Sequence, residues 1–182
     1  MEKMDRRIKY TRRVLKENLV ELLAEKPISK ISIKELCARA DINRSTFYAH
    51  YTDQYDLLNQ IEVELFEDIF SHFSRQDLKP TAEALEHLFL YIQKNASLCV
   101  SLLGEYGSTH FQYKVMDLVK HKCLPERFIE DTDPIRLEYI NLFVTGGGIS
   151  VVRHWLKTGM LQPASEIAQV LMQLVQHGAG IA

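Results

Sequence analysis

A short stretch at residues 43–51 gathers side chains that can read or grip DNA around one or two helical turns. It combines a guanidinium fork, two hydroxyls, a phenol and an imidazole: Arg44, Ser45, Thr46, Tyr48 and His50. A helix in the major groove needs such donors for guanine and for phosphates, and it needs small side chains where bulk would clash. The composition therefore indicates a DNA-reading helix, with an ordinary solvated surface helix as the alternative.

The elements before this stretch must position it. Ser32 is a plausible N-cap for a short helix over residues 33–40, whose apolar residues recur at i, i+3, i+4 and i+7. Residues 41–43 break this pattern and form a tight turn, and Asn43 can cap the helix that follows. Two short helices joined by a turn of about three or four residues are a helix-turn-helix, whose second helix enters the major groove.

Spacing within the second helix separates an inner flank from an outer one. Phe47 and Tyr51 are four residues apart, so they face inward together. Arg44 and Tyr48 share another flank, which is small, polar and rich in hydrogen-bond donors. That outer flank is the expected DNA-contacting surface.

Charge is divided unevenly along the chain. Residues 1–50 hold 12 Lys and Arg against 7 Asp and Glu, a balance of +5, whereas residues 51–182 hold 10 against 17, a balance of −7. Many of the cations lie on a predicted first helix that ends before Pro27 and carries an apolar stripe: Ile8, Leu15, Leu19 and Leu22. The asymmetry suggests an anionic partner for the N-terminal third, with plain surface scatter as the other explanation.

Helical spacing continues through the rest of the chain, and no strand pattern survives inspection. A long helix is predicted from residue 53, capped by Thr52 or Asp53. Its two apolar rows are Leu58, Ile61, Leu65, Ile69 and Phe73, and Phe66 and Phe70. Further helices are predicted over residues 81–94, 96–104, 108–123, 135–158 and 163–177. These patterns indicate an all-α protein.

Residues 8–58 resemble the N-terminal domain of the TetR/AcrR family of transcriptional regulators. The motif SIKELCARADINRSTFYAHYTDQYDLL carries the resemblance: a capped short helix, a turn, and a recognition helix that ends in Tyr-x-His-aromatic. The other two thirds resemble the family in being helical and in an aromatic-glycine rhythm of Phe143, Gly147, Trp155 and Gly159. The resemblance implies a three-helix DNA-binding domain over 1–52 and a helical regulatory and dimerisation domain over 53–182.

The resemblance also implies which residues touch DNA. Family members dimerise through their last two helices and place two recognition helices in successive major grooves. The positions carried over as DNA contacts are Lys34, Asn43, Arg44, Ser45, Thr46, Tyr48, His50 and Gln54. Gln54 departs from the family, which usually has a lysine aimed at a phosphate there. The basic first helix is therefore expected to supply more of the affinity.

Apolar residues on the last two predicted helices are the expected dimer contacts. They are Leu142, Ile149, Val152, Leu156, Ile167, Val170, Leu171, Leu174 and Val175. A core within one chain is the alternative use of the same residues. Gly146, Gly147 and Gly148 would each weaken a helix by ~1 kcal/mol relative to alanine. Close approach of another helix is the best account of them.

Residues of the middle helices are candidates for an apolar effector pocket of the kind that the family uses. They are Tyr91, Cys99, Leu103, Tyr106, Phe111, Tyr113 and Met116. Each of them has a structural role in the core as its alternative. Their side chains do not select a ligand, so a small apolar effector is an expectation that follows from the resemblance alone.

Other classes of function find no support in the sequence. The seven histidines are scattered, no nucleophile or carboxylate accompanies them, and no cofactor fingerprint occurs, so we expect neither an enzyme nor a bound cofactor. Cys37, Cys99 and Cys123 have no partner at zinc-ligand spacing, which predicts buried or reduced thiols and no metal site. No secretory signal and no run of ~18 apolar residues is present, so we expect a cytoplasmic protein without a membrane span.

These expectations combine into one function. The sequence predicts a bacterial, sequence-specific transcriptional regulator that binds a double-stranded DNA operator as a homodimer, and a repressor that a small-molecule effector releases. An activator, or a regulator controlled by a protein partner, is the alternative, and an all-helical enzyme is a remote one. The operator, the regulated genes and the effector do not follow from the sequence.

Overall fold

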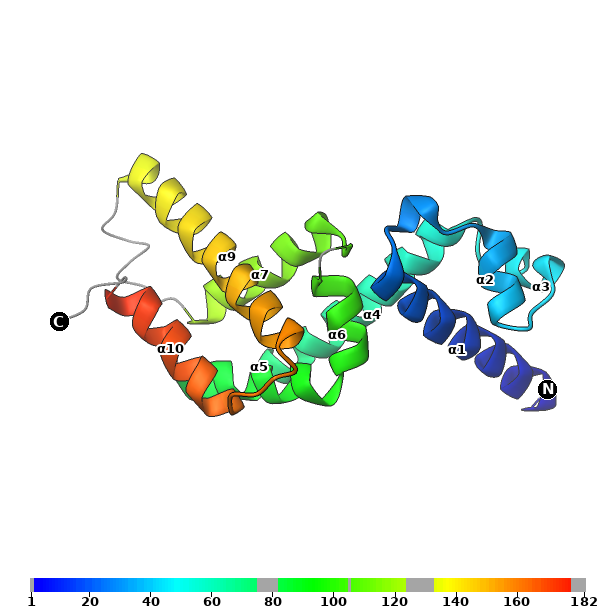
Figure 1. Ribbon diagram of the computed structural model, residues 1–182, viewed down its shortest axis with the longest axis horizontal. Coiled ribbons are helices and arrows are strands. Elements are labelled where there is room, and N and C mark those ends of the chain that lie inside the picture. Colours follow the sequence, from blue (N-terminus) through cyan, green and yellow to red (C-terminus); the bar gives the residue numbers. More distant parts are fainter. Residues whose placement is uncertain (1, 75–81, 105, 124–132, 178–182) are drawn as a thin grey trace.

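The computed structural model describes residues 2–74, 82–104, 106–123 and 133–177, and every regular element within these ranges is helical. In chain order they are α1 (Glu2–Glu25), the 3-10 turn η1 (Ile28–Lys30), α2 (Ile33–Arg39), α3 (Arg44–Tyr48), α4 (Gln54–Ser74), α5 (Ala82–Lys94), α6 (Ala96–Leu103), α7 (Thr109–Cys123), α9 (Pro134–Lys157) and α10 (Ala164–His177). Figure 1 shows an elongated molecule with α1 to α3 at one end, α9 and α10 at the other, and α4 between them. The all-α prediction is confirmed.

The N-terminal unit closes around the faces of α1, α2 and α3 that carry apolar residues. Leu15, Leu19 and Leu22 of α1 are buried, as their spacing predicts, whereas Ile8 on the same stripe is exposed near the start of the helix. Ser32 caps α2, and its hydroxyl accepts a hydrogen bond from the N–H of Glu35 at 3.2 Å. The expected short capped helix is therefore present.

Helix α4 belongs to both ends of the molecule. Asp53 is its cap, because Oδ1 of Asp53 accepts hydrogen bonds from the N–H groups of Tyr55 and Asp56, both at 2.8 Å. The predicted row is buried along the described part of the helix: Leu58, Ile61, Leu65 and Ile69. The second row is less buried than expected, because Phe66 stacks on a Phe70 side chain that is itself exposed. The side chain of Phe73 lies outside the described residues.

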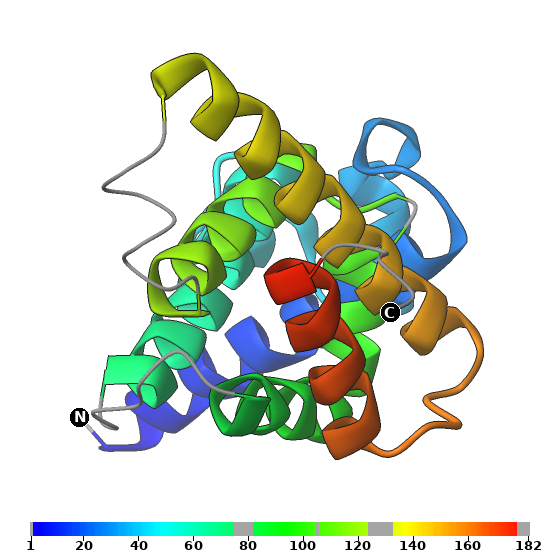
Figure 2. The same ribbon diagram turned by 90° about the vertical axis from the view of Figure 1, so that its left-hand side faces the viewer.

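The C-terminal end is a bundle in which α10 lies along α5 and below α9 (Figure 2). The ring of Phe89 meets Trp155 edge-on at 5.1 Å, and Trp155 Nε1 donates to the carbonyl of Gln162 at 2.9 Å. Left-handed Gly159 ends α9, since its φ is 76°. None of the helices in the described ranges is both long and apolar enough to cross a bilayer.

The glycine triplet of α9 has two different environments. A Cβ atom on Gly148 would lie 2.4 Å from Cε of Met116 on α7, so close helix approach accounts for this glycine, as expected. A Cβ on Gly146 or Gly147 would have no other atom within 4 Å. Nothing inside the subunit therefore requires these two glycines.

Candidate nucleic-acid interface

The turn between α2 and α3 ends α2 and leads directly into α3. Asp41 follows α2 with a φ of 52°, in the left-handed region that aspartate enters more readily than most residues. Its N–H donates to the carbonyl of Ala38 at 3.4 Å, and the N–H of Ile42 donates to the carbonyl of Cys37 at 2.9 Å. These two bonds form a Schellman motif, which ends α2 without a glycine.

Asn43 occupies the N-cap position of α3. Its backbone is extended, and its carbonyl accepts hydrogen bonds from the N–H groups of Thr46 at 2.9 Å and Phe47 at 3.0 Å. The side chain makes no capping bond, so the residue caps by position and lacks the side-chain bond that a cap usually makes. Its exposed amide can therefore donate to a group outside the helix.

Two aromatic residues hold α3 against the domain. Phe47 and Tyr51 are buried, and their ring centroids lie 5.6 Å apart, which confirms that they face inward together. Burial raises the pKa of the Tyr51 phenol, and its hydroxyl has no hydrogen-bond partner among the described residues. The ring of Tyr48 meets Phe47 edge-on at 5.6 Å, yet 52% of Tyr48 is exposed. Buried rings thus support an exposed one.

The outer flank of α3 carries the predicted DNA contacts. Arg44, Ser45 and Tyr48 are exposed, while Thr46 and His50 are half-buried beside them. Among the described residues, no carboxylate forms an ion pair with Arg44. The positive charge of Arg44 acts on Cys37, where it opposes the rise in thiol pKa that burial causes. The Arg44 side chain is thus close enough to Cys37 to affect it, and it is exposed to solvent.

The two remaining predicted contacts lie on the flanking helices. Lys34 is exposed in the first turn of α2, and Gln54 is half-buried at the start of α4. Both helix starts belong to the end of the molecule that presents α3 (Figure 1). The structure thus brings all eight residues to one end of the molecule: four lie on α3, and Asn43 and His50 flank it.

Ion pairs between α1 and α2 are a feature that sequence reasoning missed. Arg39 bonds to Glu21 at 3.2 Å and to Glu25 at 2.9 Å, and Lys26 bonds to Glu35 at 2.5 Å. The bond from Lys26 lowers the pKa of Glu35. These cations pair with acids of α1 and α2, so part of the positive balance of the N-terminal third is neutralised locally. The acids at helical spacing on α1 were the available signal.

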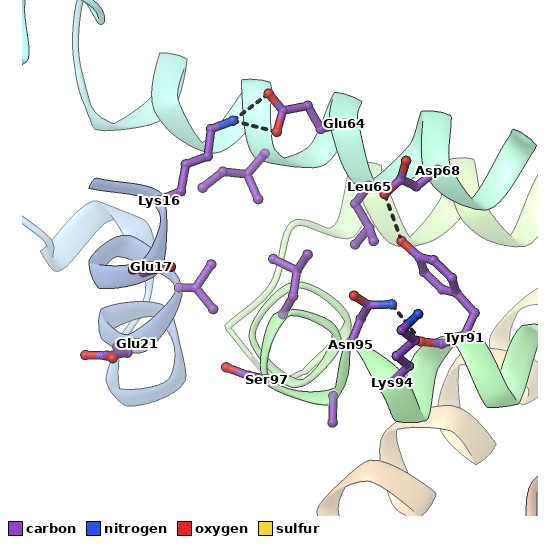
Figure 3. Close-up of a pocket in the computed structure, with 14 residues that line it drawn as sticks. Lys16, Glu17, Glu21, Glu64, Leu65, Asp68, Tyr91, Lys94, Asn95 and Ser97 are labelled. Carbon is purple, nitrogen blue, oxygen red and sulfur yellow. Dashed lines mark hydrogen bonds and ion pairs between the residues drawn. The ribbon is translucent and has the colours of Figure 1, made fainter. Parts of the chain in front are cut away.

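The predicted effector residues are divided between surface grooves and the core. Tyr91 lines a groove of about 450 Å³ between α1, α4 and the α5–α6 corner. Figure 3 shows Lys16 reaching across this groove to Glu64, with Nζ 2.5 Å from both carboxylate oxygens. On the other side the Tyr91 hydroxyl donates to Asp68 at 3.5 Å, and burial, followed by the charge of Asp68, raises the pKa of Tyr91.

The other candidates occupy different places. Cys99, Leu103 and Phe111 are core residues, and burial raises the pKa of the Cys99 thiol to about 12. Tyr106 lines a separate cavity against α9, Met116 packs on Gly148, and Tyr113 is exposed. The seven candidates therefore do not form one lining, because Tyr91 and Tyr106 line different cavities and three of the others are core residues.

The predicted dimer residues of α9 straddle two faces. Val152 and Leu156 are buried within the subunit, and Ile149 is half-buried, so the intrachain core uses this row. Leu142 is exposed on another stripe of α9, together with Ile135, Tyr139 and Phe143, each more than half exposed. Positions 135, 139, 142, 143, 146 and 147 fall on one side of a helix with 3.6 residues per turn. The predicted dimer residues of α9 therefore include both the buried row and, at Leu142, the exposed stripe, because both rows are apolar.

Helix α10 contributes mainly to the subunit's own core. Ile167 and Leu171 pack against the buried cluster, and Leu174 and Val175 are half-buried. Of the predicted dimer residues on α10, Val170 is the one with an exposed side chain. The wide apolar face of α10 is thus largely covered by α5.

Family comparison agrees with this architecture. The model described as "Bacterial regulatory proteins, tetR family" matches residues 17–61, and the model described as "Transcriptional regulator C-terminal region" matches residues 81–177, more than half of the chain. The chain belongs to the TetR family of bacterial regulatory proteins. It is a DNA-binding transcriptional regulator, as the recognition motif predicts.

Individual relatives are distant. An uncharacterized HTH-type transcriptional regulator of Bacillus subtilis, YxbF, is 21% identical over 170 residues, which are 90% of this chain and 44% of YxbF, so the chain spans less than half of that relative. A TetR regulator from Streptococcus agalactiae has a TM-score of 0.71 at 23% identity, over 94% of this chain and 97% of that one. FadR from Bacillus subtilis, solved with stearoyl-CoA, has a TM-score of 0.65 at 12% identity, over 92% and 98%. These solved structures support the fold.

Proposed function

We propose that this protein is a cytoplasmic homodimer that represses transcription from a specific operator, and that a small apolar effector releases it from DNA. The observation that carries the proposal is the outer flank of α3. Arg44 and Tyr48 are exposed there, no described carboxylate forms an ion pair with Arg44, and the ring of Tyr48 meets buried Phe47, which contacts buried Tyr51. Such a flank suits base edges and phosphates. We expect no catalysis and no cofactor.

The proposed division of labour follows the helices. Residues 1–52 bind DNA, and residues 53–182 bind the effector and the second subunit. The exposed stripe of α9 supports the dimer, because the solvent exposure of the apolar side chains of Ile135, Tyr139 and Phe143 is unfavourable. Gly146 and Gly147 continue the stripe without any side chain, which would let a second helix approach closely. In Figure 1 the N-terminal half of α9 stands clear of α10.

An effector would act through the helices that join the two units. The complex of FadR with stearoyl-CoA is consistent with an effector that has a large apolar part. We expect the effector to favour a dimer geometry that misplaces the recognition helices and to lower DNA affinity by ~1–3 kcal/mol, a typical allosteric coupling. Apolar compounds that bind the native state should also raise the melting temperature.

Selection of bound sequences from a random duplex pool tests the DNA-binding function directly. The native chain should enrich a sequence with two related half-sites about one helical turn apart, because two recognition helices enter successive major grooves. A variant with Arg44→Ala and Tyr48→Ala is the matched control, since both side chains are exposed and the buried rings stay in place. Failure of the native chain to enrich any sequence over the control would contradict the proposal.

A further inference from the structure

A second cavity lies where the DNA-binding unit meets the end of α9. It has a volume of about 490 Å³ and is lined by the end of α1, the end of α6, Tyr106 and the last turns of α9. The lining residues are Leu23, Ala24, Val100, Gly104, Tyr106, Arg153, Leu156 and Lys157. This volume falls in the range of small-molecule sites, about 300–1,000 Å³.

The described residues that line this cavity carry positive charge. Arg153 and Lys157 are among them, and none of the described lining residues is a carboxylate. Neither cation has an ion-pair partner in the part of the chain that the structure describes. Taking a cation partly out of water without a counterion is unfavourable, so the half-buried Arg153 needs an explanation.

Arg153 is also held in one orientation. Its Nε donates to the carbonyl of Leu103 at 2.9 Å, and one Nη donates to Oε1 of Gln112. Gln112 is itself buried, and its Nε2 donates to the carbonyl of Gly104 at 3.2 Å. A guanidinium has five N–H donors, and these bonds use two of them, which leaves three. Neutral hydrogen-bond acceptors therefore orient the Arg153 guanidinium and leave its positive charge uncompensated.

We infer that this cavity binds a monocarboxylate with an apolar body. Two carboxylate oxygens match a guanidinium edge, and Lys157 adds a second positive charge at the same end. Leu23, Val100 and Leu156 supply apolar walls for the rest of the molecule. The inference deepens the proposed function, on which it rests for its consequence: an acid bound here would touch both α1, which belongs to the DNA-binding unit, and α9, which carries the proposed dimer stripe.

The groove of Figure 3 has the opposite character and serves as the internal comparison. Its acids outnumber its lysines, and Lys16 bonds to Glu64 across it. Lys94 lines this groove and is exposed. A lysine substitution at position 94 thus changes the net charge of the protein as a substitution at position 157 does, without touching the proposed acid site.

Isothermal titration calorimetry of the 182-residue chain with 2-naphthoate tests the inference. We expect saturable binding that is at least about tenfold weaker for the neutral 2-naphthamide, since an ionised acceptor strengthens these hydrogen bonds by about 1.4 kcal/mol or more. Lys157→Gln and Arg153→Gln should each weaken 2-naphthoate binding about tenfold, whereas Lys94→Gln should leave it unchanged. Inorganic phosphate should not displace 2-naphthoate, because phosphate has no apolar body.

Several outcomes would overturn the site: no saturable binding, equal affinity for the acid and the amide, displacement by phosphate, or unchanged affinity in Lys157→Gln. The Lys157 side chain forms no hydrogen bond or ion pair with described residues, so the Lys157→Gln variant tests the site even if Arg153→Gln disturbs Gln112. Operator binding is measured without 2-naphthoate. A chain that binds DNA but not the acid contradicts the site alone, and a chain that binds the acid but no DNA contradicts the proposed function.

Discussion

The two ends of the molecule expose opposite kinds of side chain. At one end α3 presents Arg44 and Ser45 above buried rings, and at the other end α9 presents Tyr139 and Phe143 to solvent. An exposed arginine without an ion pair to any described residue suits an anionic, hydrogen-bonding partner, whereas an apolar stripe suits another apolar surface. The two surfaces therefore suit different kinds of partner. Each can be tested by substituting polar residues of α3 or apolar residues of α9 while the other surface stays unchanged.

The largest effect is expected from the buried support of α3. Phe47→Ala should destabilise the chain by ~3–5 kcal/mol, because it removes a fully buried aromatic ring that five-residue α3 cannot replace. Chemical denaturation measures this loss. Tyr48→Ala is the matched control, since that ring is half exposed and its removal should affect stability far less. Similar losses for both variants would show that α3 is not held by Phe47.

The sequence predicted the DNA-binding end in detail because its signals are local. The Ser32 cap, the turn at residues 41–43 and the four-residue spacing of Phe47 and Tyr51 are all short-range features, and the structure contains each of them. Bonds between helices were not predicted in the same way. Arg39 and Lys26 count toward the positive balance of the N-terminal third, and only the packing of α2 on α1 reveals their acidic partners.

The C-terminal end was predicted as helices but not as surfaces. On α9 apolar residues occur on most of the circumference, so periodicity could not tell the buried row of Val152 and Leu156 from the exposed stripe of Tyr139 and Phe143. The candidate effector residues show the same limit, because an aromatic in a core and one in a pocket have the same spacing. Which of them lines a cavity depends on how α6 packs between α1 and α9.

The second prediction separates the exposed stripe of α9 from the packed face of α10. Tyr139→Glu with Phe143→Glu should weaken dimerisation by ~2–4 kcal/mol, the range of interface hot spots, and leave a folded monomer, because both side chains are exposed. Light scattering measures the mass and circular dichroism the fold.

Leu171→Glu is the comparison for that pair. Leu171 packs against the subunit core, so its replacement should reduce solubility or stability before it affects association. A fully dimeric Tyr139→Glu, Phe143→Glu protein that keeps its operator affinity would remove the stripe of α9 from the interface.

The third prediction concerns the DNA-binding end and separates base recognition from phosphate binding. Arg44→Ala should cost ~1–3 kcal/mol on the selected operator and relax the preference at one base pair in each half-site. Arg6 and Arg7 are exposed in the first turns of α1, and their replacement by alanine should weaken all duplexes about equally. It should also flatten the plot of log K against log salt by about one unit for each phosphate that the protein no longer neutralises. Titrations at several salt concentrations measure both effects, and an unchanged base preference in Arg44→Ala would argue that this side chain grips phosphate only.

The smallest expected effect lies at Gly147 and has opposite signs in the monomer and the dimer. A Cβ at this position meets no atom of the subunit, so Gly147→Ala should stabilise the helix of a monomer by about 0.5–1 kcal/mol. If a second helix approaches the stripe of α9 closely, the same methyl group should weaken the dimer. Denaturation in the Tyr139→Glu, Phe143→Glu background measures the first effect, and the dissociation constant of the otherwise native chain measures the second.

Gly148→Ala is the control within the triplet, because its Cβ must displace Met116 inside the subunit and should not alter association directly. A Gly147→Ala chain that gains stability and dimerises as tightly as before would place the interface between subunits elsewhere.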